Sequence, residues 1–256
     1  METYELLSAM EEFAPLKLSD EFVKTYGGYD NSGVIVPLSE RLKGVVFSLD
    51  LTFNAVAHAL SNGANVLVTH HPAIYNPVKK LDGTSALYLA VKSGIGVISY
   101  HLNLDCAKHG IDYYLAEAAG AKDRSILMPL KAPSTGYGSL FGVEKTTVEN
   151  LAEKLKTALN TEKICVYGKD KTVTSVASFC GAGFDEEAFS HIYNAGVVIS
   201  ADIPHHMLLA AAEKNVSVIN LTHYASEFYG FKKFAETIIK KLKITNGEVV
   251  KDELFL

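Results

Sequence analysis

The chain has 256 residues, of which 48% are hydrophobic and 21% charged, and its formal net charge is -5 at pH 7. This length allows one large domain or two lobes with a substantial core, and the negative charge gives no overall electrostatic footprint for nucleic acid. No apolar run approaches the roughly 18 residues that a membrane-spanning helix needs, which excludes a membrane protein. The acidic N-terminus predicts no signal peptide, and three widely spaced cysteines without a CxxC pair fit a reducing compartment. We therefore expect a cytoplasmic globular protein.

Helical spacing at the N-terminus predicts a helix over 3–13 and another over 19–24. A turn-rich loop at 26–33 follows, and it is either a plain connection or a flap over a functional site. From residue 44, apolar strand patterns alternate with helical ones. Strands are expected at 44–50, 65–71 and 95–101, and helices at 54–61, 84–92 and 110–119. This alternation is typical of right-handed βαβ units with a parallel sheet.

The second half repeats the alternation after an aperiodic segment that contains two prolines. We predict a first α/β lobe over 1–122, a linker over 123–138, a second α/β lobe over 139–225, and a C-terminal helix and strand over 226–256 that return to the first lobe. Residues 44–71 and 175–206 both show a strand, a helix, an apolar strand and paired histidines. The fold class is therefore predicted as α/β, with two related lobes of mainly parallel strands and a site in the cleft between them.

Six of the nine histidines directly follow apolar strand patterns. They are His70, His71, His101, His205, His206 and His223. Because functional residues gather where the strands of open α/β sheets end, we expect these imidazoles to converge on one rim. Such a cluster would be a metal centre or an acid/base site.

The first two ligand groups follow predicted strands of the first lobe. His70 and His71 would point to opposite faces of a regular strand, but Pro72 ends the strand and the backbone beyond it could direct both into one cluster. His101 and Asp105 form the pair in HLNLD, which suits either two metal ligands or one metal ligand and the group that orients it. Asp105 fits equally well as the N-cap of the next helix.

Two further groups lie in the second lobe. In HYASE, the i, i+4 spacing would place His223 and Glu227 on one helical face, as a shared ligand pair or as a solvated surface. In ADIPHH, Asp202, His205 and His206 stand at a helix start that could hold a phosphate or simply be solvated. The roles of His205 and His206 stay open.

The remaining motifs exclude several alternatives. The glycine-rich turn at 181–185 lacks both the dinucleotide-binding fingerprint and the phosphate-binding loop, which disfavours an oxidoreductase. Cys106 has no dedicated base, so we do not expect a cysteine nucleophile.

The candidate ligands are His70, His71, Asp105, His223 and Glu227. Five residues are more than the three protein ligands of a typical catalytic zinc. They fit a pair of divalent ions that share a bridging carboxylate, and the ions could be zinc, iron, manganese or nickel.

The motifs APLKLSDEF, YDNSG, LDLT, VLVTHHP, HLNLD, GAG, ADIPHH and HYASE occur in this order along nearly the whole chain. In this ordered set the chain resembles the GTP cyclohydrolase 1 type 2 homologue family, also called Nif-three-like. The resemblance implies two related α/β lobes, a dinuclear metal site between them and a toroidal homohexamer. It also makes the five candidate residues metal ligands, with Glu227 bridging. This chain departs from the family pattern at Tyr29, Ala201 and Leu102, where Trp, Gly and Thr are usual.

The expected function is a dinuclear-metal-dependent hydrolase that acts on a nucleotide or a related phosphorylated heterocycle. The resemblance points to opening of the guanine ring of GTP by attack at C8, and His101 is the candidate catalytic residue. The alternative is a non-catalytic metal-binding toroid with a regulatory or protein-interaction role.

Overall fold

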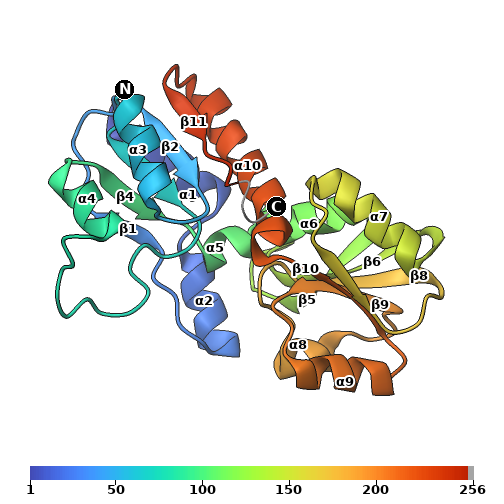
Figure 1. The fold of residues 1–256 in the computed structure, drawn as a ribbon. Helices are drawn as coiled ribbons and strands as arrows, with labels where there is room; N and C mark the ends of the chain where they lie inside the picture. Colours follow the sequence, from blue (N-terminus) through green and yellow to red (C-terminus); the bar gives the residue numbers. More distant parts are fainter. Residues whose placement is uncertain (253–256) are drawn as a thin grey trace. The chain divides into compact units, whose positions relative to one another are not determined.

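The structure, a computed structural model, describes residues 1–252 and divides into two compact units, each built around its own sheet (Figure 1). Unit 1 comprises residues 1–107 and 231–251, and unit 2 comprises residues 108–230 and Asp252. Residues 253–256, the end of the predicted segment 226–256, lie outside the described residues. Both units combine helices and strands, which confirms the predicted α/β class with two lobes.

Unit 1 is built on a five-stranded sheet in the order β1-β4-β3-β2-β11. Its strands are β1 (Gly33–Val36), β2 (Val45–Ser48), β3 (Val66–Thr69), β4 (Gly96–Ser99) and β11 (Gly247–Val249). Its helices are α1 (Thr3–Phe13), α2 (Lys17–Tyr26), α3 (Phe53–Ser61), α4 (Ala86–Lys92) and α5 (Leu102–Asp105), with the later part of α10 (His223–Leu242). All pairings are parallel except that of β1 with β4.

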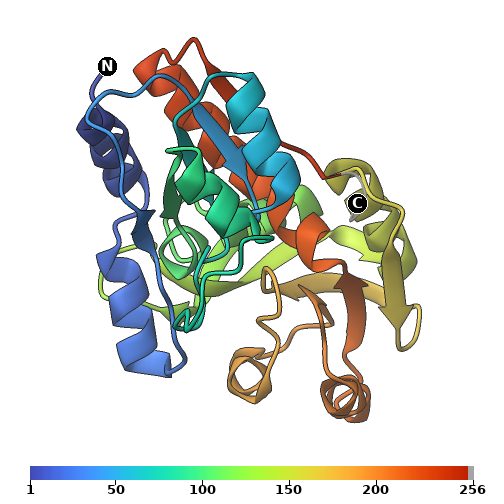
Figure 2. The same cartoon turned by 60° about the vertical axis from the view of Figure 1, so that its left-hand side comes forward.

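The core of unit 1 follows from side-chain alternation along its buried strands. Val46, Leu67 and Val97 belong to the apolar cluster beneath α3 and α4, which lie together on one face of the sheet (Figure 2). Phe47 instead contacts the rings of Phe231 and Phe234 on α10, with centroids 6.3 and 6.0 Å away. Full burial of each such aromatic side chain stabilises the unit by about 2 kcal/mol, so both faces of the sheet are held firmly.

Unit 2 contains a six-stranded mixed sheet in the order β5-β6-β8-β9-β10-β7. Its strands are β5 (Lys122–Pro129), β6 (Gly136–Thr147), β7 (Ile164–Tyr167), β8 (Thr172–Ser178), β9 (Val197–Ala201) and β10 (Ser217–Leu221). Its complete helices are α6 (Ile111–Ala119), α7 (Val148–Leu159), α8 (Glu186–His191) and α9 (His205–Glu213). Figure 1 shows α6 and α7 on one face of this sheet and α8 and α9 on the other. Only β8, β9 and β10 are parallel, so the second sheet is mixed rather than mainly parallel.

The prediction of a linker over 123–138 is wrong. These residues form much of the β5–β6 hairpin of the second sheet. The register shifts between Lys122 and Ser125, and Asp123 has a φ of 50°, which interrupts the period of two that would reveal a strand. The chain also enters unit 2 at Lys108, ahead of the predicted boundary at 122, because α6 packs against α7 and β6.

Helix α10 begins at His223, three residues before the predicted start at 226. Thr222 precedes it, and its hydroxyl accepts a hydrogen bond from the amide of Ala225, as an N-cap does. This start makes His223 helical and places it one turn before Glu227. No helix within residues 1–252 has both the length and the apolar character needed to cross a membrane.

Candidate metal centre

The first group of candidate ligands stands at the edge of the unit 1 sheet. Ser48, Thr69 and Ser99 are in register across β2, β3 and β4, so the residues after them emerge side by side. The backbone amides of His70 and His71 both donate to the carbonyl of Leu49, at 3.1 and 2.9 Å. This bend ends the strand alternation, and the two imidazole centroids lie 4.9 Å apart. The adjacent histidines therefore share one cluster.

His101 and Asp105 join the same cluster from the end of β4. The His101 ring lies 5.2 Å from that of His70 and 5.9 Å from that of His71, centroid to centroid. Asp105 Oδ1 lies 3.5 Å from His70 Nε2, and His70, His101 and Asp105 offer ligand atoms within 4.8 Å of one another. Asp105 ends α5, whereas Gly110 caps α6, so the helix-capping alternative for Asp105 is wrong.

Each imidazole of this cluster is oriented through its Nδ1 atom. The pairs are His70 with the Tyr100 carbonyl at 2.8 Å, His71 with Asp50 Oδ1 at 2.8 Å, and His101 with Asp30 Oδ1 at 2.7 Å. An oxygen acceptor at this distance favours the tautomer that is protonated at Nδ1, which leaves the Nε2 lone pair for a metal ion. The arrangement is that of histidine ligands in metal proteins.

Asp30, which the sequence motifs did not single out, contacts the candidate catalytic residue His101. Burial alone would raise the pKa of its carboxyl, but hydrogen bonds from His101, Ser19 and Ser32 outweigh that effect and lower the pKa to about 2. Asp30 is therefore a carboxylate at neutral pH and a strong acceptor for His101. Hydrogen bonds from His101 to Asp30 and Ser32 attach the turn-rich loop at 26–33 to this cluster.

The second group of candidate ligands lies in unit 2, at the start of α10. His223 Nδ1 lies 2.6 Å from Asp202 Oδ2, and His223 Nε2 lies 3.1 Å from Glu227 Oε1. Asp202 follows β9 with a φ of 49°, a left-handed conformation that Asp tolerates better than most residues. Glu227 is only 2% exposed, so the solvated-surface alternative for this pair is wrong.

The glycine-rich turn at 181–185 forms the wall behind this pair. A Cβ atom on Gly181 would lie 2.4 Å from Glu227 Oε1 and 3.1 Å from His223 Nε2. The amide of Gly181 donates to Ser226 Oγ at 2.9 Å, which ties the turn to α10. Glycine is therefore required here for close approach of the backbone to a carboxylate, and its φ of 56° is a second reason.

The histidines of α9 stand apart from this pair in their contacts. His205 and His206 are exposed at the start of the helix, and His206 Nε2 lies 2.9 Å from Glu186 Oε1 on the surface of unit 2. The expected convergence of six imidazoles is therefore wrong for His206. From the ADIPHH motif, Asp202 is the residue that contacts a candidate ligand.

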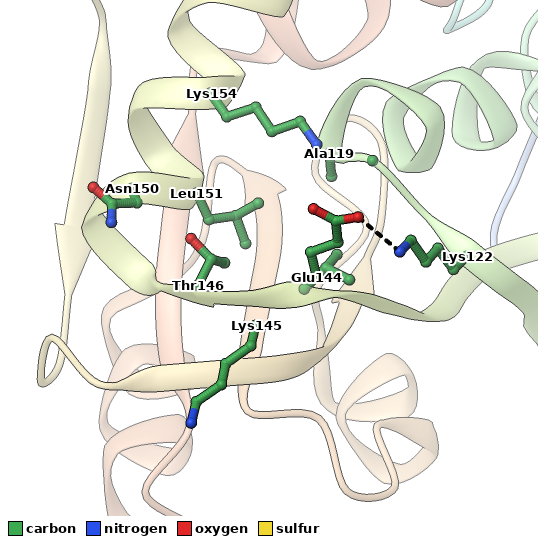
Figure 3. A pocket seen from close by; sticks show the side chains of 10 residues that line it. Ala119, Lys122, Glu144, Lys145, Thr146, Asn150, Leu151 and Lys154 are labelled. Atoms are coloured by element: carbon green, nitrogen blue, oxygen red, sulfur yellow. Dashed lines mark hydrogen bonds and ion pairs between the residues drawn. The ribbon is translucent and has the colours of Figure 1, made fainter.

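An open cavity of about 410 Å³ in unit 2 is lined by none of the candidate ligands (Figure 3). It lies between α7 and the β5–β6 hairpin and presents several lysines. Lys122 Nζ pairs with Glu144 Oε1 at 3.0 Å, and Lys154 extends toward Ala119 at the end of α6 (Figure 3). A lysine near a helix C-terminus is favoured by the helix dipole, so two of these charges have structural roles.

Comparison with known proteins gives matches over nearly the whole chain. A family model described as Duf34/NIF3 (NGG1p interacting factor 3) matches residues 1–253. A protein of Methanocaldococcus jannaschii named GTP cyclohydrolase 1 type 2 homolog is 28% identical over 250 residues, 95% of this chain and 97% of that protein. A Helicobacter pylori protein named GTP cyclohydrolase 1 type 2 is 26% identical over 228 residues, 87% of this chain and 86% of that protein.

Solved structures show the same fold. The hypothetical protein SA1388 of Staphylococcus aureus superposes with a TM-score of 0.84 at 22% identity, covering 98% of this chain and 97% of that one. Reduced HcgD of Methanocaldococcus jannaschii gives a TM-score of 0.82 at 25% identity, covering 98% of each chain. The sequence resemblance is confirmed over both lobes.

Proposed function

The chain belongs to the Duf34/NIF3 family, and from this membership and its histidine geometry we propose that it is a metal-dependent hydrolase acting on a nucleotide or a related phosphorylated heterocycle. The observation that carries the proposal is the common orientation of four imidazoles, each with Nδ1 against an oxygen acceptor. The substrate class comes from relatives named for GTP cyclohydrolase 1 type 2.

The donor atoms fit divalent transition metals. Two atoms bound to one ion at about 2.1 Å are separated by roughly 3.0 to 3.5 Å in octahedral or tetrahedral geometry. His70 Nε2 and Asp105 Oδ1 are 3.5 Å apart, and His223 Nε2 and Glu227 Oε1 are 3.1 Å apart. Imidazole and carboxylate donors suit zinc, iron, manganese or nickel. Ions of this kind supply Lewis-acid chemistry that polarises a substrate oxygen and makes water a stronger acid.

We further propose that both groups serve one dinuclear centre, in which His70, His71 and Asp105 act with His223 and Glu227. Helix α10 supports this proposal because it is continuous across the boundary between the units. Within unit 1, the Phe231 ring lies 6.2 Å from the His70 ring. Glu227 precedes Phe231 by four residues and so lies on the same helical face, one turn away. We propose that Glu227 bridges the two ions.

His101 is our candidate for proton transfer. Its Nδ1 is held by the anionic Asp30, which would stabilise a positive charge on the imidazole when Nε2 takes up a proton. His101 also shares a ligand-sized cluster with His70 and Asp105, so a role as ligand is its alternative. A His101→Ala variant that keeps its metal and loses turnover supports proton transfer, whereas loss of metal makes His101 a ligand.

Metal analysis of purified protein tests the proposal. Wild-type protein should contain about two transition-metal ions per chain, and a His70→Ala, His223→Ala double variant should lose them. His206→Ala, which removes an exposed imidazole, is the matched control and should keep the wild-type content. A double variant that retained the full metal content would contradict the dinuclear centre. Chromatographic screening of nucleotides with the reconstituted protein then tests hydrolysis.

A second candidate function is a non-catalytic metal-binding protein that regulates or binds partners. It draws on the family description, which names an interacting factor. This alternative predicts no turnover of any nucleotide with the metal in place, and partner binding that survives ligand substitutions. We also propose a homohexamer and a cytoplasmic location, and sedimentation equilibrium and cell fractionation test these two points.

A further inference from the structure

Two loops of unit 1 hold a pair of tyrosines whose rings are half exposed. Tyr29 lies between α2 and β1, and Tyr75 lies in the loop after β3; their side chains are 52% and 49% exposed. The ring centroids are 5.5 Å apart and the ring planes meet at 87°, an edge-to-face contact. Asn31 Nδ2 donates to the carbonyl of Ile74 at 2.6 Å, which joins the two loops beside the rings.

Both loops lead directly into the candidate metal centre. Tyr29 precedes Asp30, whose carboxylate lies 2.7 Å from His101 Nδ1. Tyr75 follows His71 by four residues, so their Cα atoms are separated by at most about 14 Å. Short chain segments therefore connect the tyrosine pair to the imidazole cluster of unit 1.

The loop that contains Tyr75 also contains positively charged side chains, which would attract the phosphate groups of a ligand. Lys79 and Lys80 follow it by four and five residues and are exposed. A ligand with a flat ring and phosphate groups would find an aromatic surface and ammonium groups on this one loop. Scattered single aromatic residues on a surface need no explanation, but a contacting pair whose loops are joined by the hydrogen bond from the Asn31 side chain to the Ile74 carbonyl is a preorganised surface.

We propose that Tyr29 and Tyr75 bind the planar ring of the substrate, a purine-type heterocycle: one tyrosine stacks on it face to face, and the other, at 87° to the first, supports that ring and contacts the edge of the heterocycle. The inference rests on the proposed function, because it names the part of that substrate which unit 1 recognises. Tyrosine faces stack on any base, and loss of one such contact weakens binding by roughly 5- to 100-fold. Neither tyrosine is a candidate metal ligand, so substitution of either should leave the metal content unchanged.

The sequence provides a clean spectroscopic test, because the chain contains no tryptophan. A Tyr29→Trp variant would carry a single tryptophan at the proposed stacking surface, and excitation at the red edge of the absorption band would select it over the tyrosines. GTP and guanosine should quench its emission, and inorganic triphosphate should not. A Tyr4→Trp variant, at a 67% exposed position of α1, is the matched control and should not respond. Calorimetry with GTP should show roughly 5- to 100-fold weaker binding by Tyr29→Ala and by Tyr75→Ala, and near wild-type binding by Tyr29→Phe.

The readouts separate this inference from the hydrolase proposal. Quenching without turnover supports the stacking surface and counts against hydrolysis. Turnover with unchanged GTP affinity in Tyr29→Ala and Tyr75→Ala overturns the stacking surface and leaves hydrolysis standing. Absence of quenching by both GTP and guanosine also overturns it. If both alanine variants instead dissociate an oligomer in sedimentation, the pair is a contact between copies of the chain and the inference is wrong.

Discussion

Replacement of Gly181 by alanine should weaken metal binding strongly without unfolding unit 2. The left-handed backbone at φ 56° costs an alanine about 1 kcal/mol. The new Cβ would lie 2.4 Å from Glu227 Oε1, where ordinary contacts begin at 3.4 Å, so the carboxylate oxygen must move by about 1 Å. Metal sites tolerate deviations of about 0.2 Å in ligand distance, so we expect metal binding at least roughly 10- to 100-fold weaker.

Gly63 provides the matched control for this experiment. Its φ is 65°, close to that of Gly181, but a Cβ at this position would meet nothing within 4 Å. Gly63→Ala should therefore lose about the same 1 kcal/mol of stability and keep the wild-type metal affinity. The assay is a competitive titration with a metal chelator, together with urea unfolding of the metal-free variants. Equal metal affinities for Gly181→Ala and Gly63→Ala would refute the reasoning.

Four other substitutions test three contacts around the ligand groups and one buried ion pair of unit 2. Asp50→Asn and Asp202→Asn remove carboxylates that orient His ligands, and chelator titration should show metal binding about 10- to 100-fold weaker; wild-type affinity would contradict an orienting role. The pKa of Asp30 falls from 3.8 unfolded to about 2 folded, which contributes about 2 kcal/mol above pH 4 that is lost as pH falls toward 2. In metal-free protein, the stability difference between wild type and Asp30→Asn should therefore shrink over that range in urea titrations, and a constant difference would contradict it. Arg124→Ala should lower the free energy of unfolding of unit 2 by about 3 kcal/mol, because it removes the cation that lies 3.4 Å from the fully buried Asp112. Urea unfolding measures this change, and a loss below about 1 kcal/mol would refute the prediction.

The sequence predicts the candidate ligands best where a buried parallel strand ends. His70 and His71 follow a continuous apolar run, and register across the sheet brings the next strand end, with His101, beside them. This inference needs only local pattern and the rule that such strands share one edge. The same reasoning fails for His206, because its strand is followed by a helix start that faces solvent and Glu186.

The residues that orient the ligands were not predictable from the motifs. Asp50 is the last residue of a predicted strand and could have been found by the rule that identified His71, since both strands end at the same edge. Asp30 carries no such signal. It comes from a loop whose turn residues indicate only a change of direction, and its contact with His101 joins positions 71 residues apart in the chain.

The boundaries of the lobes were hidden by local irregularity. The β5–β6 hairpin has a register shift and charged residues at its start, so its alternation is too weak to distinguish from a linker. The predicted start of α10 is three residues late because the apolar pattern of β10 ends at Leu221 and leads directly into Thr222, which caps the helix. Such boundaries depend on capping contacts that a hydrophobic period does not report.

The central proposal is that His70, His71, Asp105, His223 and Glu227 hold one pair of ions, and anomalous diffraction from metal-loaded crystals tests it most directly. The account predicts two anomalous peaks per chain, each within about 2.3 Å of donor atoms, with Glu227 touching both and with His70, His71 and Asp105 on one side and His223 on the other. Peaks bound by residues of one unit only, or a peak that Glu227 does not contact, would contradict it.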